Sequence, residues 1–282
     1  MPEAHSPTVR GRKLAAELRR LRNAAGLSAD QAAAHLGKGW SQSNVSRIEG
    51  TKTKPSEADV IAMLELYGDG GQRAALLELH KNSWRRGWWT DYSDVFRGSY
   101  VALEDDASRI DEWSPQLIPG LLQTDEYARE VIRAGWPGDE AGVHRRVQAR
   151  MTRKALLGRT APAAPELTAI LDEGVLRRPI GGPDLMRAQL NALLDAARRP
   201  NVDIRVLPFA AGTHAGLDGP FILLGFDEDA APDVAYVGTR IGDGYAEDAA
   251  TVRAIRVDFE TLQAAALPSG ESLGFIAAIT KE

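Results

Sequence analysis

Apolar residues recur three and four positions apart in two neighbouring segments, residues 28–36 and 41–49. This spacing places them on one face of an α-helix. Ser28 and Ser41 precede the two segments and are favourable N-cap residues, and Gly37 is a typical C-terminal stop. The pattern therefore predicts two short helices joined by a tight polar turn, with these residues on their packed faces: Ala32, Ala33, Leu36, Val45 and Ile48.

The same periodicity predicts further helices before and after this pair, over residues 11–25, 56–67 and 73–82. Gly26 ends the first of them, and the sequence GDGG at residues 68–71 separates the last two. The N-terminal part of the chain is thus predicted to be all helical.

Polar side chains occupy the open faces of the helix predicted over residues 41–49. Gln42, Ser43, Asn44 and Arg47 carry the donors and acceptors that read base edges in a DNA major groove. A second helix that presents such side chains after a tight turn is the arrangement of a helix-turn-helix. The pattern predicts that this segment binds double-stranded DNA and that these four residues contact bases.

Nearby cationic residues are candidates for contacts with the DNA backbone. Lys52 and Lys54 follow the second helix, and Arg12 and Lys13 begin the first predicted helix. We expect these four and Ser41, which also caps its helix, to position the phosphates. The alternative for Arg12 and Lys13 is a solvated helix face, which is common for charged runs.

Residues 10–70 resemble the helix-turn-helix regulators of the XRE (Cro/C1-type) family, most specifically in the sequence SQSNVSRIEG. The resemblance implies a DNA-binding transcriptional regulator. It also implies that the acid at Glu49 has a structural role within the fold and does not read bases.

The second part of the chain changes its pattern along its length. Helical periodicity covers residues 100–110, 124–134, 138–158, 183–198, 249–267 and 271–279. Pro115 and Pro119 forbid a continuous helix between the first two of these, so an extended segment and turn is expected there. Runs of β-branched and aromatic residues predict strands over residues 167–171, 202–207, 221–226 and 234–237. The predicted fold is therefore a mainly α N-terminal helix-turn-helix domain and a larger α+β C-terminal domain with a small sheet.

A chain of 282 residues is too long for a helix-turn-helix alone and favours two domains. We expect a disordered arm over residues 1–10, the DNA-binding domain over 11–82, a Trp-rich linker or hinge over 83–98 and a regulatory or partner-binding domain over 99–282. Three interpretations of the Trp-rich segment remain open: a packed hinge, a subunit interface or a base-stacking platform.

Charge is divided unequally between the two parts. Residues 1–89 hold 14 Lys or Arg and 9 Asp or Glu, a net charge of +5, whereas residues 90–282 have a net charge of −10. The positive part coincides with the segment expected to bind phosphates. The chain has no cysteine, no long apolar run and no apolar leader at its N-terminus, which fits a cytoplasmic protein without a membrane segment.

The C-terminal part resembles the domain that follows the helix-turn-helix in a set of actinobacterial regulators, including the WhiJ-like and Scr1-type antitoxin-like regulators. The resemblance lies in SPQLIPGLLQT, ILDEGVLRR and PNVDIRVLPFAAGTHAGLDGPFILLGF. Such proteins are often encoded beside a small partner protein. The resemblance implies a domain that binds a partner protein or senses a small-molecule effector.

Four residues of this part form a possible ligand or partner pocket: Asp172, Glu173, Arg177 and His214. The alternative is that they form hydrogen bonds within the fold. A His and a carboxylate in loops can perform acid–base chemistry, but the sequence has no nucleophile elbow, phosphate-binding loop or HExxH motif. Its five histidines lack ligand spacing. We therefore expect no enzyme activity, no metal and no cofactor.

These observations predict a transcriptional regulator, most simply a repressor of its own or a neighbouring operon. A single helix-turn-helix reads few base pairs, so we expect a homodimer on a palindromic operator, with the second domain supplying much of the interface. Two other classes remain open. One is an antitoxin-like protein whose main task is to bind a small partner, and the other is an enzyme with a DNA-binding appendage.

Overall fold

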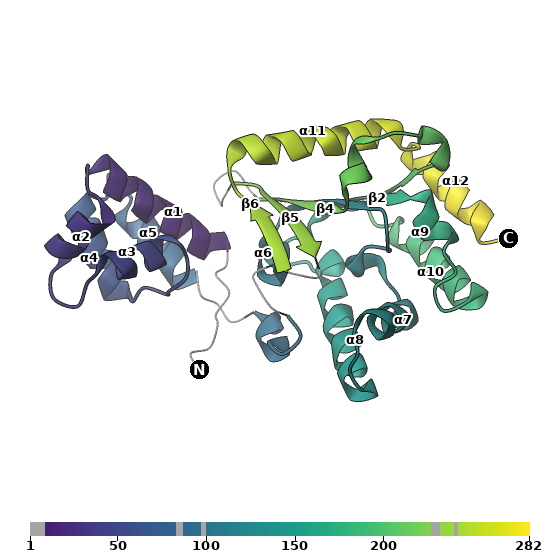
Figure 1. Cartoon of the computed structure of the whole chain (residues 1–282), viewed down its shortest axis with the longest axis horizontal. Coiled ribbons are helices and arrows are strands. Elements are labelled where there is room, and N and C mark those ends of the chain that lie inside the picture. Colours follow the sequence, from purple (N-terminus) through teal and green to yellow (C-terminus); the bar gives the residue numbers. More distant parts are fainter. Residues whose placement is uncertain (1–8, 83–86, 97–99, 227–231, 240–241) are drawn as a thin grey trace. The chain divides into compact units, whose positions relative to one another are not determined.

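The computed structural model describes residues 9–82, 87–96, 100–226, 232–239 and 242–282 (Figure 1). The described residues form two compact units. The N-terminal unit takes those within residues 9–91 and 100–106, and the C-terminal unit those within 92–96, 107–226 and 232–282. Most of the predicted arm (residues 1–8) and parts of the predicted linker (83–86 and 97–98) lie outside the described residues.

The N-terminal unit contains the five predicted helices, which begin and end within two residues of the predicted bounds. They are α1 (Val9–Ala24), α2 (Ala29–Leu36), α3 (Gln42–Glu49), α4 (Glu57–Tyr67) and α5 (Arg73–Asn82), followed by the short η1 (Trp88–Tyr92) and α6 (Tyr100–Asp106). Of the apolar positions identified by periodicity, Ala32, Ala33, Val45 and Ile48 are buried and Leu36 is partly buried against them. The core of this unit includes Leu14, Leu18, Ala32, Val45, Ile48, Val60, Met63, Leu64 and Leu76.

Caps define the ends of these helices as the sequence predicts. The Ser28 hydroxyl accepts a hydrogen bond from the Gln31 amide, and the Gln31 side chain accepts one from the Ser28 amide, which completes a capping box. The Ser41 hydroxyl accepts the Asn44 amide at the start of α3. Gly37 ends α2 with φ of 86°, a backbone conformation that favours glycine.

The C-terminal unit is built on a six-stranded mixed sheet of order β3-β2-β1-β4-β5-β6. The strands are β1 (Arg109–Ser114), β2 (Glu166–Asp172), β3 (Val202–Leu207), β4 (Phe221–Gly225), β5 (Val234–Thr239) and β6 (Gly242–Ala246). Strands β1, β2 and β3 are parallel, and β4 pairs with β1 in antiparallel orientation. The central strand β1 therefore joins a parallel half of the sheet to an antiparallel half.

Helices cover both faces of this sheet, with α11 along one face and α7 and α8 on the other (Figure 1). The α-helices are α7 (Asp125–Gly135), α8 (Glu140–Lys154), α9 (Glu173–Arg177), α10 (Pro183–Ala196), α11 (Ala249–Ala265) and α12 (Ser269–Ile279). The short 3-10 helices are η2 (Gly120–Leu122), η3 (Ala155–Gly158), η4 (Phe209–Ala211) and η5 (Ala215–Asp218).

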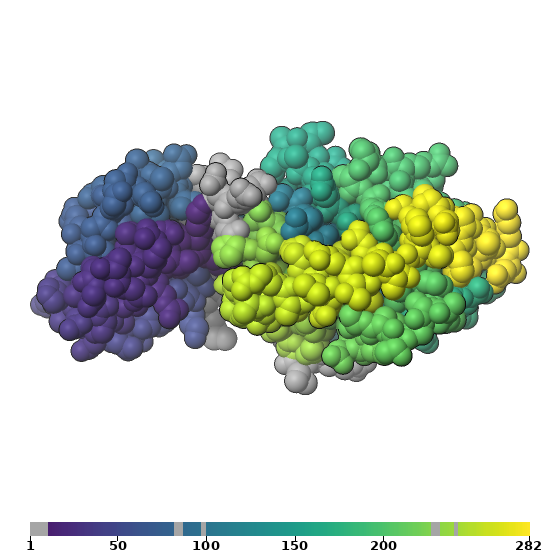
Figure 2. All heavy atoms as spheres, turned by 90° about the horizontal axis from the view of Figure 1, so that it is seen from above, coloured from purple at the N-terminus to yellow at the C-terminus, as the bar shows by residue number. Residues whose placement is uncertain are grey.

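A core packs between the sheet and α11. It is centred on Trp113 of β1, which is completely buried, and includes Phe259 and Leu262 of α11. The other side of α11 faces solvent, where α11 and α12 form part of the molecular surface (Figure 2), and Val257 is 59% exposed. Since side chains alternate along a strand, Asp111 and Trp113 face α11 and the intervening Glu112 faces α8.

The prediction of a helix over residues 100–110 is wrong at its C-terminal end. Helix α6 stops at Asp106, and residues from Arg109 onward form β1, which the sequence pattern did not predict as a strand. A central strand is normally an apolar run, and the local sequence here is rich in charge. Ion pairs explain the exception, because Asp111 is paired with Arg109 and Arg256.

Two further elements were missed, β6 and α9, but the predicted fold class is confirmed. The four predicted strands correspond to β2, β3, β4 and β5. Strand β6 consists largely of glycine and polar residues, and α9 is only five residues long, so neither carries a periodic signal.

In the part of the chain that the structure describes, no helix combines the length and the apolar character needed to cross a membrane.

Candidate nucleic-acid interface

Two of the eight residues of helix α3 belong to the apolar core of the N-terminal unit. Val45 is completely buried and Ile48 is 6% exposed, and both belong to the core formed with α1, α2 and α4. This attachment orients the helix so that its remaining faces are open. The cap at Ser41 fixes the position at which the helix begins.

The four predicted base-contacting residues lie on those open faces. Gln42, Ser43, Asn44 and Arg47 are all exposed. The Asn44 amide donates to the Gly39 carbonyl at 3.3 Å, and the Gln42 amide donates to the Ser46 hydroxyl at 3.4 Å. Both bonds are long and solvent-accessible, so these side chains can exchange them for contacts with a ligand.

The loop after α3 holds the predicted backbone-contacting lysines close to the predicted base-contacting residues. The amides of Lys52 and Thr53 donate to the Arg47 carbonyl at 2.8 and 3.2 Å, which folds the loop back against the last turn of α3. Lys52 and Lys54 are exposed. Their cationic groups therefore project from the same region as Arg47.

A surface hollow of about 330 Å³ lies between the turn before α3, the exposed side of α3 and the loop after it. Asn44, Arg47 and Lys54, three of the residues predicted to contact DNA, line it. Lys38 and Trp40 of the turn and Thr53 line it as well. The Thr53 hydroxyl is buried and has no hydrogen-bond partner among the described residues. The sequence did not predict that Lys38 and Trp40 belong to this region, because a turn has no periodicity from which the neighbours of its side chains can be inferred.

The first turn of α1 approaches the same loop. Gly11 and Leu14 line a small cavity together with Thr51 and Pro55. Arg12 and Lys13, the other two predicted phosphate-contacting residues, lie between them in the sequence and are partly exposed. The structure therefore brings α1, the loop after α3 and α3 itself to one region, although they are separate in sequence.

Glu49 ends α3 in an ion pair and does not present a free negative charge to this region. Its two carboxylate oxygens accept from Nε and Nη2 of Arg22, both at 2.8 Å, and the two side chains are 4% and 10% exposed. The hydrogen bond to Glu49 raises the pKa of Arg22. This arrangement agrees with the structural role that the family resemblance implies for Glu49.

Tyr67 of α4 packs beside this ion pair. Burial raises the pKa of its hydroxyl to about 12, and the nearby Glu49 adds to the effect. The hydroxyl has no hydrogen-bond partner among the described residues. The surroundings of the ion pair are therefore poorly solvated.

The polar residues proposed as a pocket in the C-terminal unit form contacts within the fold. Asp172 ends β2 and caps α9 by accepting the Gly174 amide at 2.7 Å. Glu173 accepts from Arg177 at 2.6 Å and from the Phe209 amide at 2.9 Å. Burial opposes ionisation of Glu173, but these two donors outweigh it and lower the pKa of the carboxyl. Arg177 also pairs with Glu282.

His214, the fourth residue of that set, lies at the start of η5. Its Nδ1 accepts the Gly216 amide at 3.2 Å, and its ring packs edge-on against Trp113 at 5.4 Å between centroids. These contacts explain His214 as part of the loop packing. Among the described residues, no group of three or more potential metal ligands is close enough to hold an ion.

Comparison with known proteins finds a separate family match in each part of the chain. The profile of a helix-turn-helix domain matches residues 13–77, which contain α2 and α3, and indicates a DNA-binding regulator. The profile described as "Domain of unknown function (DUF5753)" matches residues 97–278. Searches of curated proteins and of solved structures found no match. The chain therefore belongs to the family defined by this domain of unknown function (DUF5753), here preceded by a helix-turn-helix domain.

Proposed function

We propose that the protein is a sequence-specific transcriptional regulator of the XRE type, which represses its own or a neighbouring operon. The observation that carries this proposal is the position of Gln42, Ser43, Asn44 and Arg47 on the open faces of a capped helix. Arg, Asn and Gln side chains form bidentate hydrogen bonds with base edges in the major groove, and a Ser hydroxyl can add a single contact. We assign base reading to these four residues.

Cations around the recognition helix support a role in phosphate binding. Lys38, Lys52 and Lys54 lie in the turn and the loop that flank α3, and Arg12 and Lys13 lie on the approaching turn of α1. Phosphate contacts position a protein on the duplex and carry no sequence information themselves. Pairing Glu49 with Arg22 removes the repulsion that a free carboxylate at this surface would cause.

For the C-terminal unit we propose a binding role instead of catalysis. The acidic and basic residues that suggested acid–base chemistry are hydrogen-bonded to each other and to backbone amides. Sensing of an effector, binding of a partner protein and dimerisation are each compatible with such a unit.

The experiment that tests the function is binding of the purified full-length protein to the DNA upstream of its own reading frame, titrated in salt beside an unrelated duplex. We expect selective binding with a steep salt dependence, because Lys and Arg release counterions from the phosphates. Equal and weak binding to both duplexes would contradict the proposal.

Two variants separate the proposed roles in the same assay. We expect Arg47→Ala to cost about 1–3 kcal/mol on the operator and little on unrelated DNA, because it removes a base contact. Lys52→Ala should weaken binding to both duplexes alike. It should also reduce the slope of log affinity against log salt concentration by about one. Arg187→Ala, in the C-terminal unit, removes the same charge from an exposed position and should change neither quantity. Equal losses on both duplexes for Arg47→Ala would refute its assignment as a base reader.

A further inference from the structure

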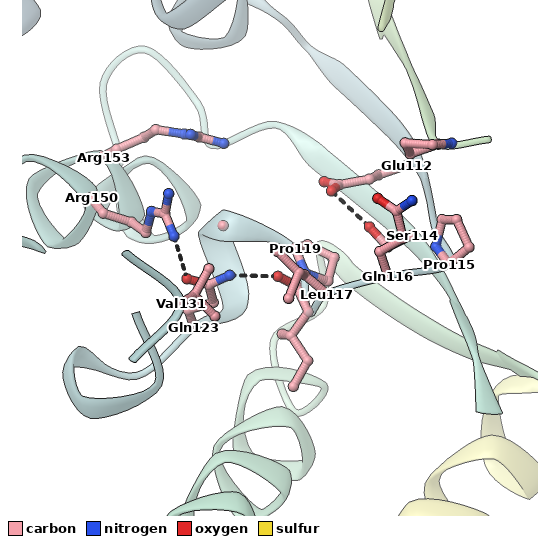
Figure 3. Close-up of a pocket in the computed structure, with 13 residues that line it drawn as sticks. Glu112, Ser114, Pro115, Gln116, Leu117, Pro119, Gln123, Val131, Arg150 and Arg153 are labelled. Carbon is pink, nitrogen blue, oxygen red and sulfur yellow. Dashed lines mark hydrogen bonds between the residues drawn. The ribbon is translucent and has the colours of Figure 1, made fainter. Parts of the chain in front are cut away.

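The C-terminal unit contains a cleft of about 250 Å³ that none of the contacts described above uses (Figure 3). It lies between the segment that follows β1, residues 115–120, and helix α8. The two prolines of this segment, Pro115 and Pro119, prevent regular structure and leave it curved around the opening. The cleft is thus formed by the part of the sequence that contains SPQLIPG.

Two cations of α8, Arg150 and Arg153, line this cleft. Gln123, which also lines it, holds Arg150 together with the neighbouring Lys154. Arg150 donates from Nη1 to the Gln123 side-chain oxygen at 2.8 Å, and Lys154 donates to the Gln123 backbone carbonyl at 3.0 Å. The Gln123 side chain is 2% exposed and donates in turn to the Ile118 carbonyl at 2.7 Å. These neutral acceptors orient the cations without neutralising them.

Arg150 and Lys154 therefore keep an uncompensated positive charge. No carboxylate of the described residues forms an ion pair with either side chain, although the sequence from residue 90 onward is acidic overall. Burial, together with the neighbouring charge of Arg153, lowers the pKa of Arg150 to about 10. A partly buried guanidinium without a counter-charge is costly for the fold and typical of a site that receives an anion.

The rest of the lining limits what that anion can be. Leu117, Ile118 and Val131 provide apolar surface along the cleft. Glu112 and Ser114 of β1 lie at the other end from Arg150 and Gln123, with the Ser114 hydroxyl donating to the Glu112 carboxylate at 2.9 Å (Figure 3). A second negative charge on the ligand would meet Glu112. With two cations, Arg150 and Arg153, and one carboxylate, Glu112, the lining has one positive charge in excess. It therefore favours a single anionic group on a small apolar body.

We propose that this cleft binds a small organic monocarboxylate, with the Arg150 guanidinium as the carboxylate-binding group and the apolar wall holding the hydrocarbon part. The planar guanidinium has five N–H donors and pairs with a carboxylate through two parallel hydrogen bonds. Inorganic phosphate fits less well, because it carries more charge and no apolar surface. The proposal rests on the proposed sensing role of the C-terminal unit and specifies its effector class. Its test contains no DNA, so carboxylate binding and DNA binding can each fail independently of the other.

The test is isothermal titration calorimetry of the full-length protein with isovalerate and with phenylacetate. We expect saturable binding with a dissociation constant on the order of 1 mM or tighter for at least one acid. Isovaleramide, the neutral counterpart of isovalerate, should not bind, and inorganic phosphate should not compete. Binding should also raise the melting temperature, because the ligand stabilises only the folded state.

Two variants and one control locate the binding in this cleft. Arg150→Gln should weaken it at least tenfold. Leu117→Trp keeps every charge and fills the cleft from a position that is 38% exposed, so it tests the same site if Arg150→Gln fails to fold. Arg187→Gln on α10 should bind as the unaltered protein does.

Several results would overturn the proposal. They are equal binding of isovalerate and isovaleramide, unchanged binding by Arg150→Gln or Leu117→Trp, competition by phosphate, and no saturable binding of either acid up to about 50 mM.

Discussion

The pair of Arg22 and Glu49 shows how single residues hold helix α3 in place. Arg22 also donates to the Leu27 carbonyl at 2.6 Å, so one guanidinium connects the end of α1, the start of the next segment and the end of α3. Both charges are removed from water, and their bidentate geometry compensates for the lost hydration. Helix α3 therefore depends on this pair for its orientation as well as on Val45 and Ile48.

We expect Arg22→Ala to destabilise the N-terminal unit by about 3 kcal/mol, because it leaves the Glu49 carboxylate buried and unpaired. Arg20→Ala, two residues away, breaks an exposed pair with Glu17 and should cost less than about 1 kcal/mol. Urea denaturation of both variants checks this difference. Equal losses would show that the buried pair has no special role.

At the scale of elements, an ion-pair network ties the central strand to the helix that covers it. Asp111 of β1 contacts Arg109 at 3.2 Å and Arg256 of α11 at 3.3 Å, and both arginines also pair with Asp233 beside β5. Asp111 is 6% exposed. Its burial raises the pKa of the carboxyl, an effect that the two arginines oppose.

We expect Arg256→Met to destabilise the C-terminal unit by about 2 kcal/mol at neutral pH, less than a full unpaired charge costs because Arg109 remains. The substitution should raise the pKa of Asp111 further. The folded state then binds the proton more strongly. The stability deficit of Arg256→Met relative to the unaltered protein should therefore shrink as the pH falls and Asp111 becomes neutral.

Thermal unfolding between neutral and acidic pH measures that deficit. Arg253→Met, at an exposed position one turn earlier on α11, is the control and should show little change at any pH. A deficit for Arg256→Met that stays constant with pH would rule out Asp111 as its cause.

For the whole molecule, charge is divided unequally between the two parts of the chain. The positive charge of +5 lies within residues 1–89, which include the helix-turn-helix, and the charge of −10 lies within the rest. An acidic second unit is repelled by DNA and limits unspecific association with it. A single recognition helix covers few base pairs, which is why a symmetric pair of subunits is expected on the operator.

We expect light scattering to give the mass of a dimer, and the operator to contain two half-sites about 34 Å apart. Insertion of about half a helical turn, roughly 5 base pairs, between the half-sites should weaken binding at least tenfold, since it turns one half-site away from its subunit. A monomeric mass, or binding that does not depend on the spacing, would refute the dimer.

Local signals were sufficient for the N-terminal unit. Its helices follow from apolar spacing and from serine caps such as Ser28 and Ser41, both of which depend on residues within one or two turns. The exposure of Arg47 follows in the same way, since a helix that buries Val45 and Ile48 must present its other faces to solvent. The strands β2 and β3 were predictable from their apolar runs for the same reason.

Tertiary structure alone decided the features that depend on distant partners. Strand β1 carries the buried Asp111 at the centre of a sheet, and Arg256, 145 residues away, helps Arg109 to compensate its charge. Arg22 is buried because it forms an ion pair with Glu49. Arg150 lines the cleft because it donates a hydrogen bond to the Gln123 side chain. The sequence by itself determined a helix-turn-helix followed by an α+β domain, since periodicity and capping are local. It did not determine which charges are buried, because the cost of burying a charge depends on a partner that only the folded chain brings near.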